Sequence, residues 1–513
     1  MTNKTFIIST SLIVALGGFL LGFDASVISG VVPFIESYFV LNKLQLGWSV
    51  SCLTLASTLA MMIAGPLSDR FGRRKVLIYA AVLFTVSAFT SAIATTFWFF
   101  VVARMIGGFG VGLALLIAPM YIAEISPPRM RGSMVSLNQF TIVFGISVAY
   151  FSNYFLLKTG VNNWRWMLGV ETIPAVLYFI FLFFVPESPR WMAMKGKTEK
   201  ALDTLIKANG EEEGRSEFSN INESLAADTR KEKVSLMELF SPAMRLVMTL
   251  ALAIAFFQQA TGINAILYYA PMIFEQTGLG RDASFAQAII VGLTNFTFTF
   301  IAIWLIDKLG RKPLLLAGLS GMAIFLFLLA FGFKAATYTL DDKGFANAQK
   351  LVQDNPRQKI AVIQLERIKN KTFTNDIAFK KALRTIVGKE QAAVLENILI
   401  ANSIAINGWF ILIAIIGFVA SFAMAIGPII WVLLSELFPN RLRGRAISFA
   451  GFVNSVVAFI VVLIFPWQIN TLGNFGTFFI FGVLAIIALA FVYIKLPETK
   501  GKSLEEIEKV LVQ

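Results

Sequence analysis

Twelve long apolar stretches constrain the fold of this 513-residue chain more than any other feature. A helix that crosses the ~30 Å hydrocarbon core of a bilayer needs about 20 apolar residues, and each stretch is about that long or longer. The stretches lie at about 7–33, 45–67, 76–94, 97–122, 134–156, 167–185, 246–275, 285–306, 313–333, 404–434, 446–466 and 475–494. Backbone polar groups in lipid must be hydrogen-bonded within the protein, so the sequence predicts an all-α membrane protein with twelve transmembrane helices.

The composition excludes several classes of function. Hydrophobic residues make up 57% of the chain and charged residues 15%, against roughly 45–50% and about 25% in soluble domains. The chain has no His and a single Cys, Cys52, so imidazole catalysis, an intrachain disulfide and a Cys–His metal site are ruled out. No nucleophile constellation is visible either. We therefore expect no enzyme, no metal and no cofactor.

The placement of Lys and Arg predicts the orientation in the membrane. The formal net charge is +13, and the basic residues gather in alternate short loops at 70–75, 129–131, 308–312 and 441–445. Short cytoplasmic loops are enriched in Lys and Arg, so we expect these loops and both termini in the cytoplasm, with the protein in a cell membrane. The basic excess then reflects topology and anionic lipid headgroups, and we expect no nucleic-acid partner. The first stretch is too long for a signal peptide and carries Asp24.

Four segments of the first half recur in the second half, which indicates an internal repeat. The first two pairs share almost the same offset: Gly22-Phe-Asp24 recurs as Gly262-Ile-Asn264, and Asp69-Arg-Phe-Gly-Arg-Arg74 recurs as Asp307-Lys-Leu-Gly-Arg-Lys312. The other two share a longer offset: the segment from Glu124 to Gly132 recurs from Glu436 to Gly444, and Pro186-Glu-Ser recurs as Pro497-Glu-Thr. One insertion between the two sets explains both offsets.

The repeat predicts two six-helix halves, at 1–185 and 246–496, joined by a cytoplasmic helical linker at 186–245. The insertion lies at about 335–403, on the extracytoplasmic side. It has no readable chemistry, and we expect an accessory or interaction element rather than a second binding site. A short cytoplasmic helix or tail follows at 497–513. Parallel repeats of this kind are typical of transporters with a substrate site at the midplane between the halves.

The motifs resemble those of a known family. The segment from Gly65 to Arg74 is similar to the loop 2–3 signature of the major facilitator superfamily. The sugar porter branch of that superfamily is resembled by four further motifs: Pro186-Glu-Ser-Pro-Arg190, Gln258-Gln259-x4-Asn264, Gly427-Pro428-x2-Trp431 and Pro497-Glu-Thr-Lys-Gly501. The resemblance covers nearly the whole chain except 335–403, and it implies the major facilitator fold. The motifs look most like those of bacterial xylose–proton symporters and glucose facilitators.

Three charged residues inside apolar stretches are candidates for proton coupling: Asp24, Arg104 and Glu171. A charge in lipid costs several kcal/mol and is by default a functional hypothesis. The resemblance implies that the Asp and Arg form a coupling switch, since facilitators carry Asn in place of this Asp, and that Glu171 is a further acid of such symporters. The alternative is a static ion pair between helices.

Polar side chains in otherwise apolar helices are candidates for sugar binding, because an amide can both donate to and accept from a hydroxyl. The set, which by resemblance matches the family's sugar and outer-gate positions, is Gln139, Gln258, Gln259, Asn264, Tyr268, Asn295, Trp431 and Asn454. Any one amide can instead link helices, and Trp431 can stack on a sugar or pack beside Pro428. Gln258 and Gln259 are about 100° apart on a helix, which predicts that only one points straight into a cavity. Relatives carry Trp where this chain has Ser455, so one aromatic wall is missing.

Charged residues of the basic loops are candidates for a cytoplasmic gate whose ion pairs would join the halves and favour an outward-open state. The set is Asp69, Arg70, Arg74, Glu124, Arg131, Glu187, Arg190, Asp307, Arg311, Glu436 and Arg443. The alternative is a role in topology and loop capping.

These features predict a secondary active transporter, a monomer, that imports a monosaccharide with protons by alternating access. Its partners are the sugar, protons and the lipid bilayer. A proton-independent facilitator of the same fold is the main alternative. A sugar-sensing receptor would need a signalling tail, and a drug exporter would not be expected to carry the pattern from Gln258 to Asn264.

Overall fold

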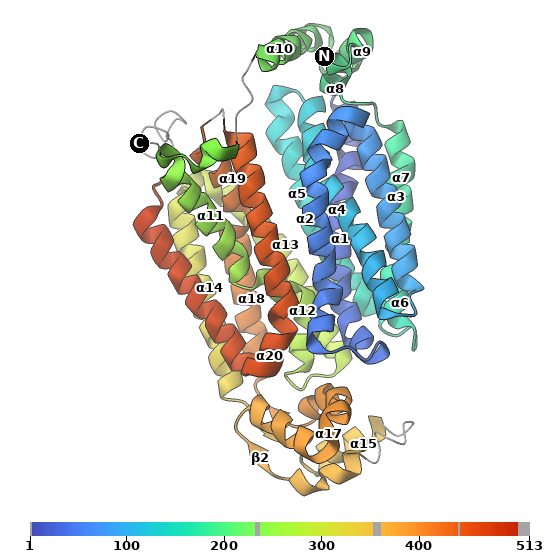
Figure 1. Cartoon of the computed structure of the whole chain (residues 1–513), viewed down its shortest axis with the longest axis vertical. Helices are drawn as coiled ribbons and strands as arrows, with labels where there is room; N and C mark the ends of the chain where they lie inside the picture. Colours follow the sequence, from blue (N-terminus) through green and yellow to red (C-terminus); the bar gives the residue numbers. More distant parts are fainter. Residues whose placement is uncertain (1–2, 231–235, 352–360, 440–441, 501–513) are drawn as a thin grey trace. The chain divides into compact units, whose positions relative to one another are not determined.

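Helices form most of the chain in the computed structural model, which describes residues 3–230, 236–351, 361–439 and 442–500 (Figure 1). The chain divides into two compact units. Unit 1 comprises Met1–Ile28 and Ser51–Ser235, and unit 2 comprises Ser29–Val50 and Leu236–Gln513. The first two helices contribute to both units, because the turn that joins them belongs to unit 2.

The helices of unit 1 begin and end at residues that commonly start or terminate helices. Gly72, with φ of 99°, separates α2 from α3, the Thr96 side chain caps α4, and Pro128 stands in the first turn of α5. The spans are α1 (Lys4–Tyr38), α2 (Lys43–Phe71), α3 (Arg73–Ala92), α4 (Phe97–Ile125), α5 (Pro128–Leu156), and the pair α6 (Asn163–Gly169) and α7 (Thr172–Phe181). A 3-10 turn, η1 (Leu182–Phe184), and three short helices follow in the linker: α8 (Pro189–Met194), α9 (Thr198–Asn209) and α10 (Glu211–Arg230).

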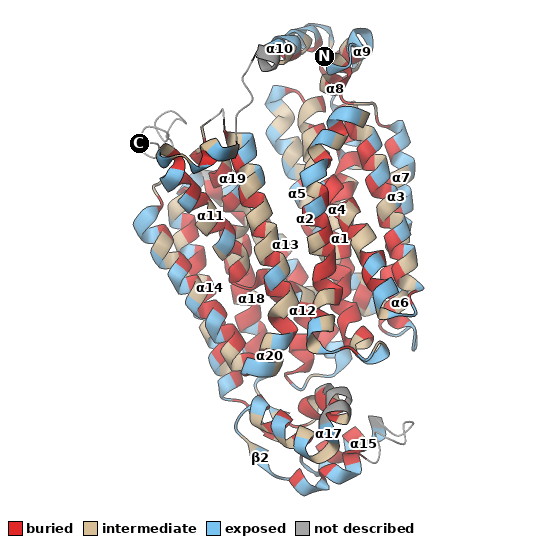
Figure 2. Cartoon of the chain, viewed as in Figure 1, coloured by how far each residue is buried: buried red, intermediate tan, exposed pale blue. Residues whose placement is uncertain are grey.

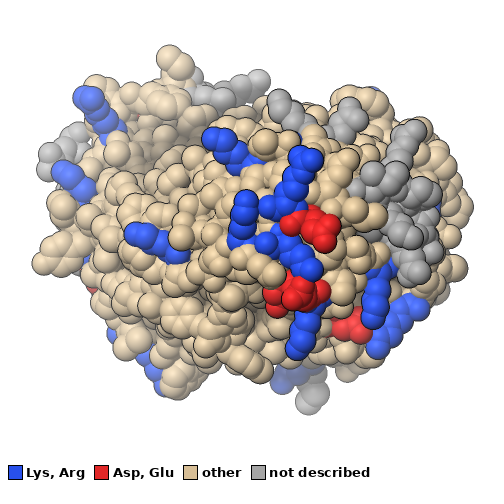
Figure 3. All heavy atoms as spheres, turned by 90° about the horizontal axis from the view of Figure 1, so that it is seen from below, with Lys and Arg blue, Asp and Glu red and all other residues tan. Residues whose placement is uncertain are grey.

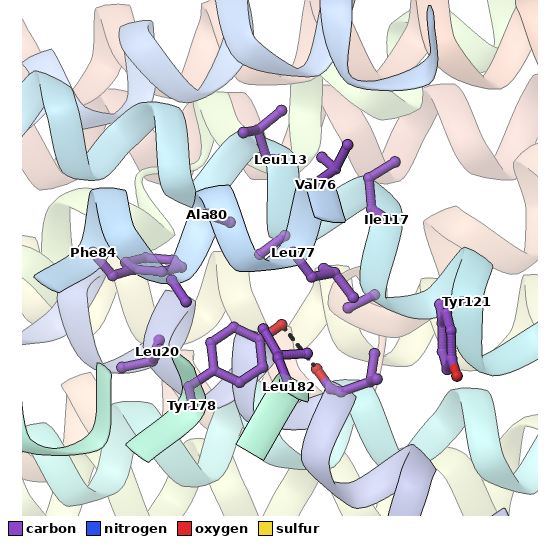
Figure 4. Close-up of a cluster of buried hydrophobic side chains, with 14 of the residues drawn as sticks. Leu20, Val76, Leu77, Ala80, Phe84, Leu113, Ile117, Tyr121, Tyr178 and Leu182 are labelled. Carbon is purple, nitrogen blue, oxygen red and sulfur yellow. Dashed lines mark hydrogen bonds between the residues drawn. The ribbon is translucent and has the colours of Figure 1, made fainter. Parts of the chain in front are cut away.

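The core of unit 1 joins α1, α3, α4 and α7 (Figure 4). Leu77, Phe84 and Ile117 are fully buried there, and the Tyr178 hydroxyl donates a hydrogen bond of 3.5 Å to the Val14 carbonyl oxygen. Helix α4 approaches α2 closely at Gly112, where a Cβ atom would lie 2.3 Å from the Ser57 carbonyl oxygen. Small residues at helix contacts are typical of membrane bundles, where close packing replaces the hydrophobic effect.

Unit 2 contains two spans that are each broken into two helices, and one long helix that holds two spans. Two 3-10 turns, η2 (Leu236–Phe240) and η3 (Pro242–Met244), lead into α11 (Arg245–Ala260). The other helices are α12 (Ile263–Glu275), α13 (Arg281–Leu309), α14 (Arg311–Lys334), α18 (Gly408–Met424), α19 (Ile426–Leu437) and α20 (Arg443–Lys495). Gly262, with φ of 86°, separates α11 from α12, and Ala425 separates α18 from α19. Gly473 has φ of 74° inside α20 and divides it into two spans.

The predicted twelve transmembrane helices are confirmed. The described part of the chain has 11 helices or helix pairs that are long and apolar enough to span a membrane, and one of them is the divided helix α20. Large apolar side chains are exposed along them, among them Trp98 (66%) and Phe155 (70%). Such side chains suit a lipid surrounding. The tenth predicted stretch begins too early, because Ile404–Ala405 is a strand and α18 starts at Gly408. Of the predicted tail, residues 501–513 lie outside the described residues.

The insertion is a folded module with a core of its own. Its elements are β1 (Thr337–Thr339), α15 (Asp342–Leu351), η4 (Leu365–Ile368), β2 (Thr372–Phe373), α17 (Asp376–Ala401) and β3 (Ile404–Ala405). The strands form an antiparallel sheet in the order β2-β1-β3. Tyr338, Leu365 and Phe379 are among its buried residues, and Figure 2 shows buried positions along α15 and α17. The sequence predicted no such fold for this segment.

Candidate functional site

A buried ion pair joins α1 and α4 in unit 1. Arg104 Nη1 donates to Asp24 Oδ1, and Nη2 donates to the Asp24 backbone oxygen at 3.0 Å. Both residues are 1% exposed, and Glu171 is 2% exposed at the break between α6 and α7. Glu171 is close enough to interact electrostatically with both partners. The structure thus brings the three predicted coupling residues together.

The hydrogen bonding of this charged group is incomplete. Asp24 Oδ2, Arg104 Nε and Glu171 Oε1 are buried and have no hydrogen-bond partner among the described residues. Gly107 faces the group, because a Cβ atom there would lie 3.0 Å from Asp24 Oδ2 and 2.4 Å from the Ser87 hydroxyl. An unpaired buried charge is costly, and a carboxylate can remove it by binding a proton. Asp24 Oδ2 and Glu171 Oε1 are therefore candidate sites for that proton.

Four of the predicted sugar-binding amides form one network in unit 2. Asn454 on α20 donates to Gln258 Oε1 at 2.7 Å and to the Ala255 carbonyl oxygen at 2.8 Å. Gln259 Nε2 donates to Asn454 Oδ1 at 3.1 Å, and Asn264 Nδ2 donates to Gln259 Oε1 at 2.8 Å. Both glutamines therefore join the network, although they are neighbours on α11. Gln258 is buried, whereas Gln259 and Asn264 are half-buried.

The broken helices position this network. Gly262 allows the turn that brings Asn264 back to Gln259, and no side chain fits there, since a Cβ atom would lie 2.4 Å from the Phe481 ring. At the second break, Gln258 Nε2 donates to the carbonyl oxygens of Ile426 and Gly427, at 3.2 and 3.1 Å. Irregular backbone at membrane depth needs such replacement hydrogen bonds.

The other four predicted sugar-binding residues lie on α19, α13, α12 and α5. Trp431 on α19 is 47% exposed, and its ring lies beside Gly451, 3.8 Å from the place of a Cβ atom. Asn295 on α13 is buried, and Tyr268 on α12 is half-buried. Gln139 belongs to unit 1, where it is exposed on α5. The roles of all eight residues stay predictions.

Ion pairs join the basic helix ends of unit 1 to one another, and hydrogen bonds join them to the linker. Arg73 Nε and Nη2 each lie 3.0 Å from one oxygen of Glu124, and Arg73 Nη1 donates to Asp69 at 2.9 Å. The Ser188 hydroxyl also donates to Glu124. Glu187 accepts from the backbone N–H of Arg74 at 3.0 Å, and Arg74 Nε donates to the Leu182 carbonyl oxygen.

Unit 2 repeats this arrangement. Arg311 Nη2 donates to Glu436 at 2.9 Å, and the Thr499 hydroxyl donates to the other Glu436 oxygen at 2.6 Å. Glu498 accepts from the backbone N–H groups of Arg311 and Lys312, at 3.1 and 3.0 Å. Burial raises the pKa of Glu498, but these and further backbone N–H donors outweigh it, so the pKa lies below its ordinary value.

The described contacts of the gate set lie within each unit, and its gating role stays a prediction. Glu124 pairs with Arg73 and Glu436 with Arg311, whereas the Arg131 guanidinium donates to Glu217 on α10. Arg443 donates to the Phe438 carbonyl oxygen, Arg190 to the Ser224 hydroxyl, and Arg70 lies over the Phe71 ring. The side chain of Asp307 lies outside the described residues. Arg73 and Glu498 were missed, although each aligns through the internal repeat with a residue in the set, Arg311 and Glu187.

Two units of membrane-spanning helices joined by a helical linker are the architecture of the major facilitator superfamily, to which a matching solved structure belongs at 33% identity. The family described as Sugar (and other) transporter matches residues 10–348 and 386–511, and the chain belongs to it. The chain is 35% identical to the arabinose-proton symporter of Bacillus subtilis, over 99% of this chain and 96% of that protein. It is 34% identical to the D-xylose-proton symporter of Escherichia coli, over the same shares.

The fold is also similar to solved structures. The xylose transporter XylE from E. coli, in an inward open conformation, matches with a TM-score of 0.74 and 32% identity, over 98% of this chain and 100% of that chain. The chain is therefore a multi-pass membrane protein of the sugar transporter family. The family match omits residues 349–385, which lie within the insertion.

Proposed function

We propose that this protein imports a monosaccharide together with protons. The observation that carries the proposal is the buried pair of Asp24 and Arg104 with Glu171 beside it. Two carboxylates face one guanidinium, so a negative charge is in excess when both are ionised. A proton bound by the group would remove that excess and weaken the hold of Asp24 on Arg104. A facilitator would not need a titrating carboxylate at this place.

The amide network of unit 2 is the proposed sugar site. Gln259 and Asn264 hydrogen-bond to each other and are half-buried, so sugar hydroxyls can exchange for this contact. Trp431 offers an exposed ring on the same unit for the C–H face of a sugar. The names of the relatives, arabinose-proton and D-xylose-proton symporters, support a small sugar as substrate.

Transport would proceed by alternating access, with the proton and the sugar bound in the same half-cycle. We place the basic loops and both termini in the cytoplasm, because Lys and Arg are concentrated in those short loops. With this orientation, the insertion lies on the extracytoplasmic side of the membrane. Release of Arg104 on protonation of Asp24 would couple the two ligands.

The test uses the purified protein in proteoliposomes. Labelled arabinose, xylose and glucose would be offered with and without an inward proton gradient. We expect accumulation above equilibrium only with the gradient, loss of accumulation with a protonophore, and alkalinisation of the outer medium when sugar is added. Uptake that stops at equilibrium under a gradient, with no proton movement, would identify a facilitator instead.

A further inference from the structure

The insertion forms one wall of a basic pocket. The pocket has a volume of about 440 Å³ and lies between α17 and the end of the first span of α20. Its lining includes Lys380, Lys381 and Arg384 from α17, and Asn470 and Thr471 from α20. Among the residues that the structure describes, the lining contains no Asp or Glu, although Asp376 and Glu396 lie next to the lining Lys380 and Arg384. The sugar and coupling residues lie elsewhere, so the proposed transport cycle does not use this pocket.

The positive charge of the lining is only partly neutralised. Lys380 is buried and lies 3.3 Å from Asp376 and 3.5 Å from Glu396. Arg384 Nη2 lies 3.5 Å from Glu396 and donates to Asn470 Oδ1 at 2.6 Å. Among the described side chains, its other N–H groups and the Asn470 amide nitrogen have no hydrogen-bond partner and can donate to a ligand. Lys381 is exposed and makes no ion pair with any side chain that the structure describes.

We propose that this pocket binds a phosphate-type oxyanion, carried by an anionic lipid headgroup or by a soluble phosphate compound. Arg, Lys, amide and hydroxyl groups supply several donors around one space, which is how proteins hold the oxygens of a phosphate. Glu396 fixes the positions of Lys380 and Arg384 from behind, so the cations are held in place before a ligand arrives.

The surroundings of the pocket favour a lipid as the carrier of the phosphate. Ile377, which lines the pocket, is about two-fifths exposed. Trp467 and Leu472, which flank the lining Asn470 and Thr471 along α20, are exposed to a similar extent. Trp is enriched where a membrane meets water, and an exposed apolar rim suits acyl chains. Figure 3 views the chain from below the orientation of Figure 1, and a group of Lys and Arg side chains with a few acidic ones is visible from that side.

The test compares Lys381→Glu with Lys371→Glu, which reverses an exposed charge on the same module outside the pocket. Retention of phosphatidylglycerol and phosphatidylcholine would be measured by native mass spectrometry, and binding of inorganic phosphate by calorimetry. Lys381→Glu should weaken the binding of the anionic ligand by about fivefold or more, and Lys371→Glu should leave it close to that of the parent. The exposed position of Lys381 means that unfolding temperatures should stay equal.

The two binding measurements distinguish a lipid from a soluble compound as the source of the oxyanion. The lipid is supported if the parent prefers phosphatidylglycerol and does not bind inorganic phosphate, and if Lys381→Glu loses the preference for phosphatidylglycerol. Binding of inorganic phosphate that Lys381→Glu weakens supports a soluble ligand. Asn470→Ala, which removes a donor but no charge, should weaken the same ligand. Absence of binding in both arms, or equal effects of Lys381→Glu and Lys371→Glu, would overturn the proposal.

Discussion

Arg73 and Glu124 form a bidentate ion pair, with two N–H···O bonds of 3.0 Å. A hydroxyl from the segment after the sixth span completes the contact, and Arg311, Glu436 and Thr499 take the same places in unit 2. The repeat seen in the sequence is therefore also a repeat of hydrogen bonds. Each of these pairs lies within one unit, so it ties the end of one span to the ends of others in the same unit.

This pair should contribute more stability than an exposed pair nearby. Arg73 and Glu124 side chains are 7% and 11% exposed, whereas Arg131 is 42% exposed in its contact with Glu217. Glu124→Ala leaves a buried guanidinium poorly paired and should cost about 3 kcal/mol, against about 0–1 kcal/mol for Glu217→Ala. Thermal unfolding in detergent measures both. Equal shifts in the two variants would contradict the difference in burial.

Neutralising the intramembrane carboxylate should separate exchange from accumulation. Asp24→Asn removes the titrating group but keeps the shape of the site, so gradient-driven accumulation should be abolished while counterflow exchange of sugar persists. Asp203→Asn, an exposed substitution on α9, is the control. If Asp24→Asn still concentrates sugar against its gradient, Asp24 is not the coupling residue.

Removing one amide of the network should weaken sugar binding. Asn264→Ala deletes a single described side-chain hydrogen bond and should lower affinity by about 1–3 kcal/mol with little change in unfolding temperature. Gln258→Ala should lower both the sugar affinity and the unfolding temperature, since the Gln258 side chain also donates to two carbonyl oxygens at the break before α19. Equilibrium sugar binding and thermal unfolding of the ligand-free protein separate the effects. Unchanged affinity in both variants would reject the assignment of the site.

Deleting the insertion should spare sugar binding. Its core is separate from the amide network, and β1 and β3 pair at Tyr338 and Ile404, so the chain enters and leaves at adjacent points. Replacing about 340–400 by a Gly/Ser linker should therefore leave folding and basal transport largely intact. The measurement is equilibrium sugar binding beside the parent. A folded deletion variant without sugar affinity would show that the insertion takes part in recognition.

The stability of the insertion should fall in acid. Burial raises the pKa of Glu396, but Lys43, Lys380 and Arg384 outweigh it, so the pKa lies below its ordinary value of 4.5. A lowered pKa means stabilisation that is present above the ordinary value and is lost as the pH falls through the lowered one. Hydrogen exchange of α17 across that range measures the loss. In Glu396→Gln the module should be less stable at neutral pH and should lose this part of the pH dependence.

The sequence was sufficient for the spans and the family, and insufficient for many contacts. Charge-free length predicts a transmembrane helix directly, and Asp24 and Arg104 were recognisable as partners because each is the prominent charge of its stretch. The Glu124 partner was not recognisable, because several arginines lie nearby in the loops and only the folded geometry selects Arg73. The bonds of Gln258 to backbone carbonyl oxygens were equally hidden, since the sequence does not mark which carbonyls a broken helix leaves open.

The pairing of β1 with β3 has a consequence for how such chains can diversify. A segment whose first and last strands are neighbours can be gained, lost or exchanged without changing the spacing of the two helices that carry it, here α14 and α18. The family match is interrupted inside this segment and continuous on both sides of it. Natural selection can therefore alter the surface of this segment while the membrane-spanning helices on either side of it stay the same.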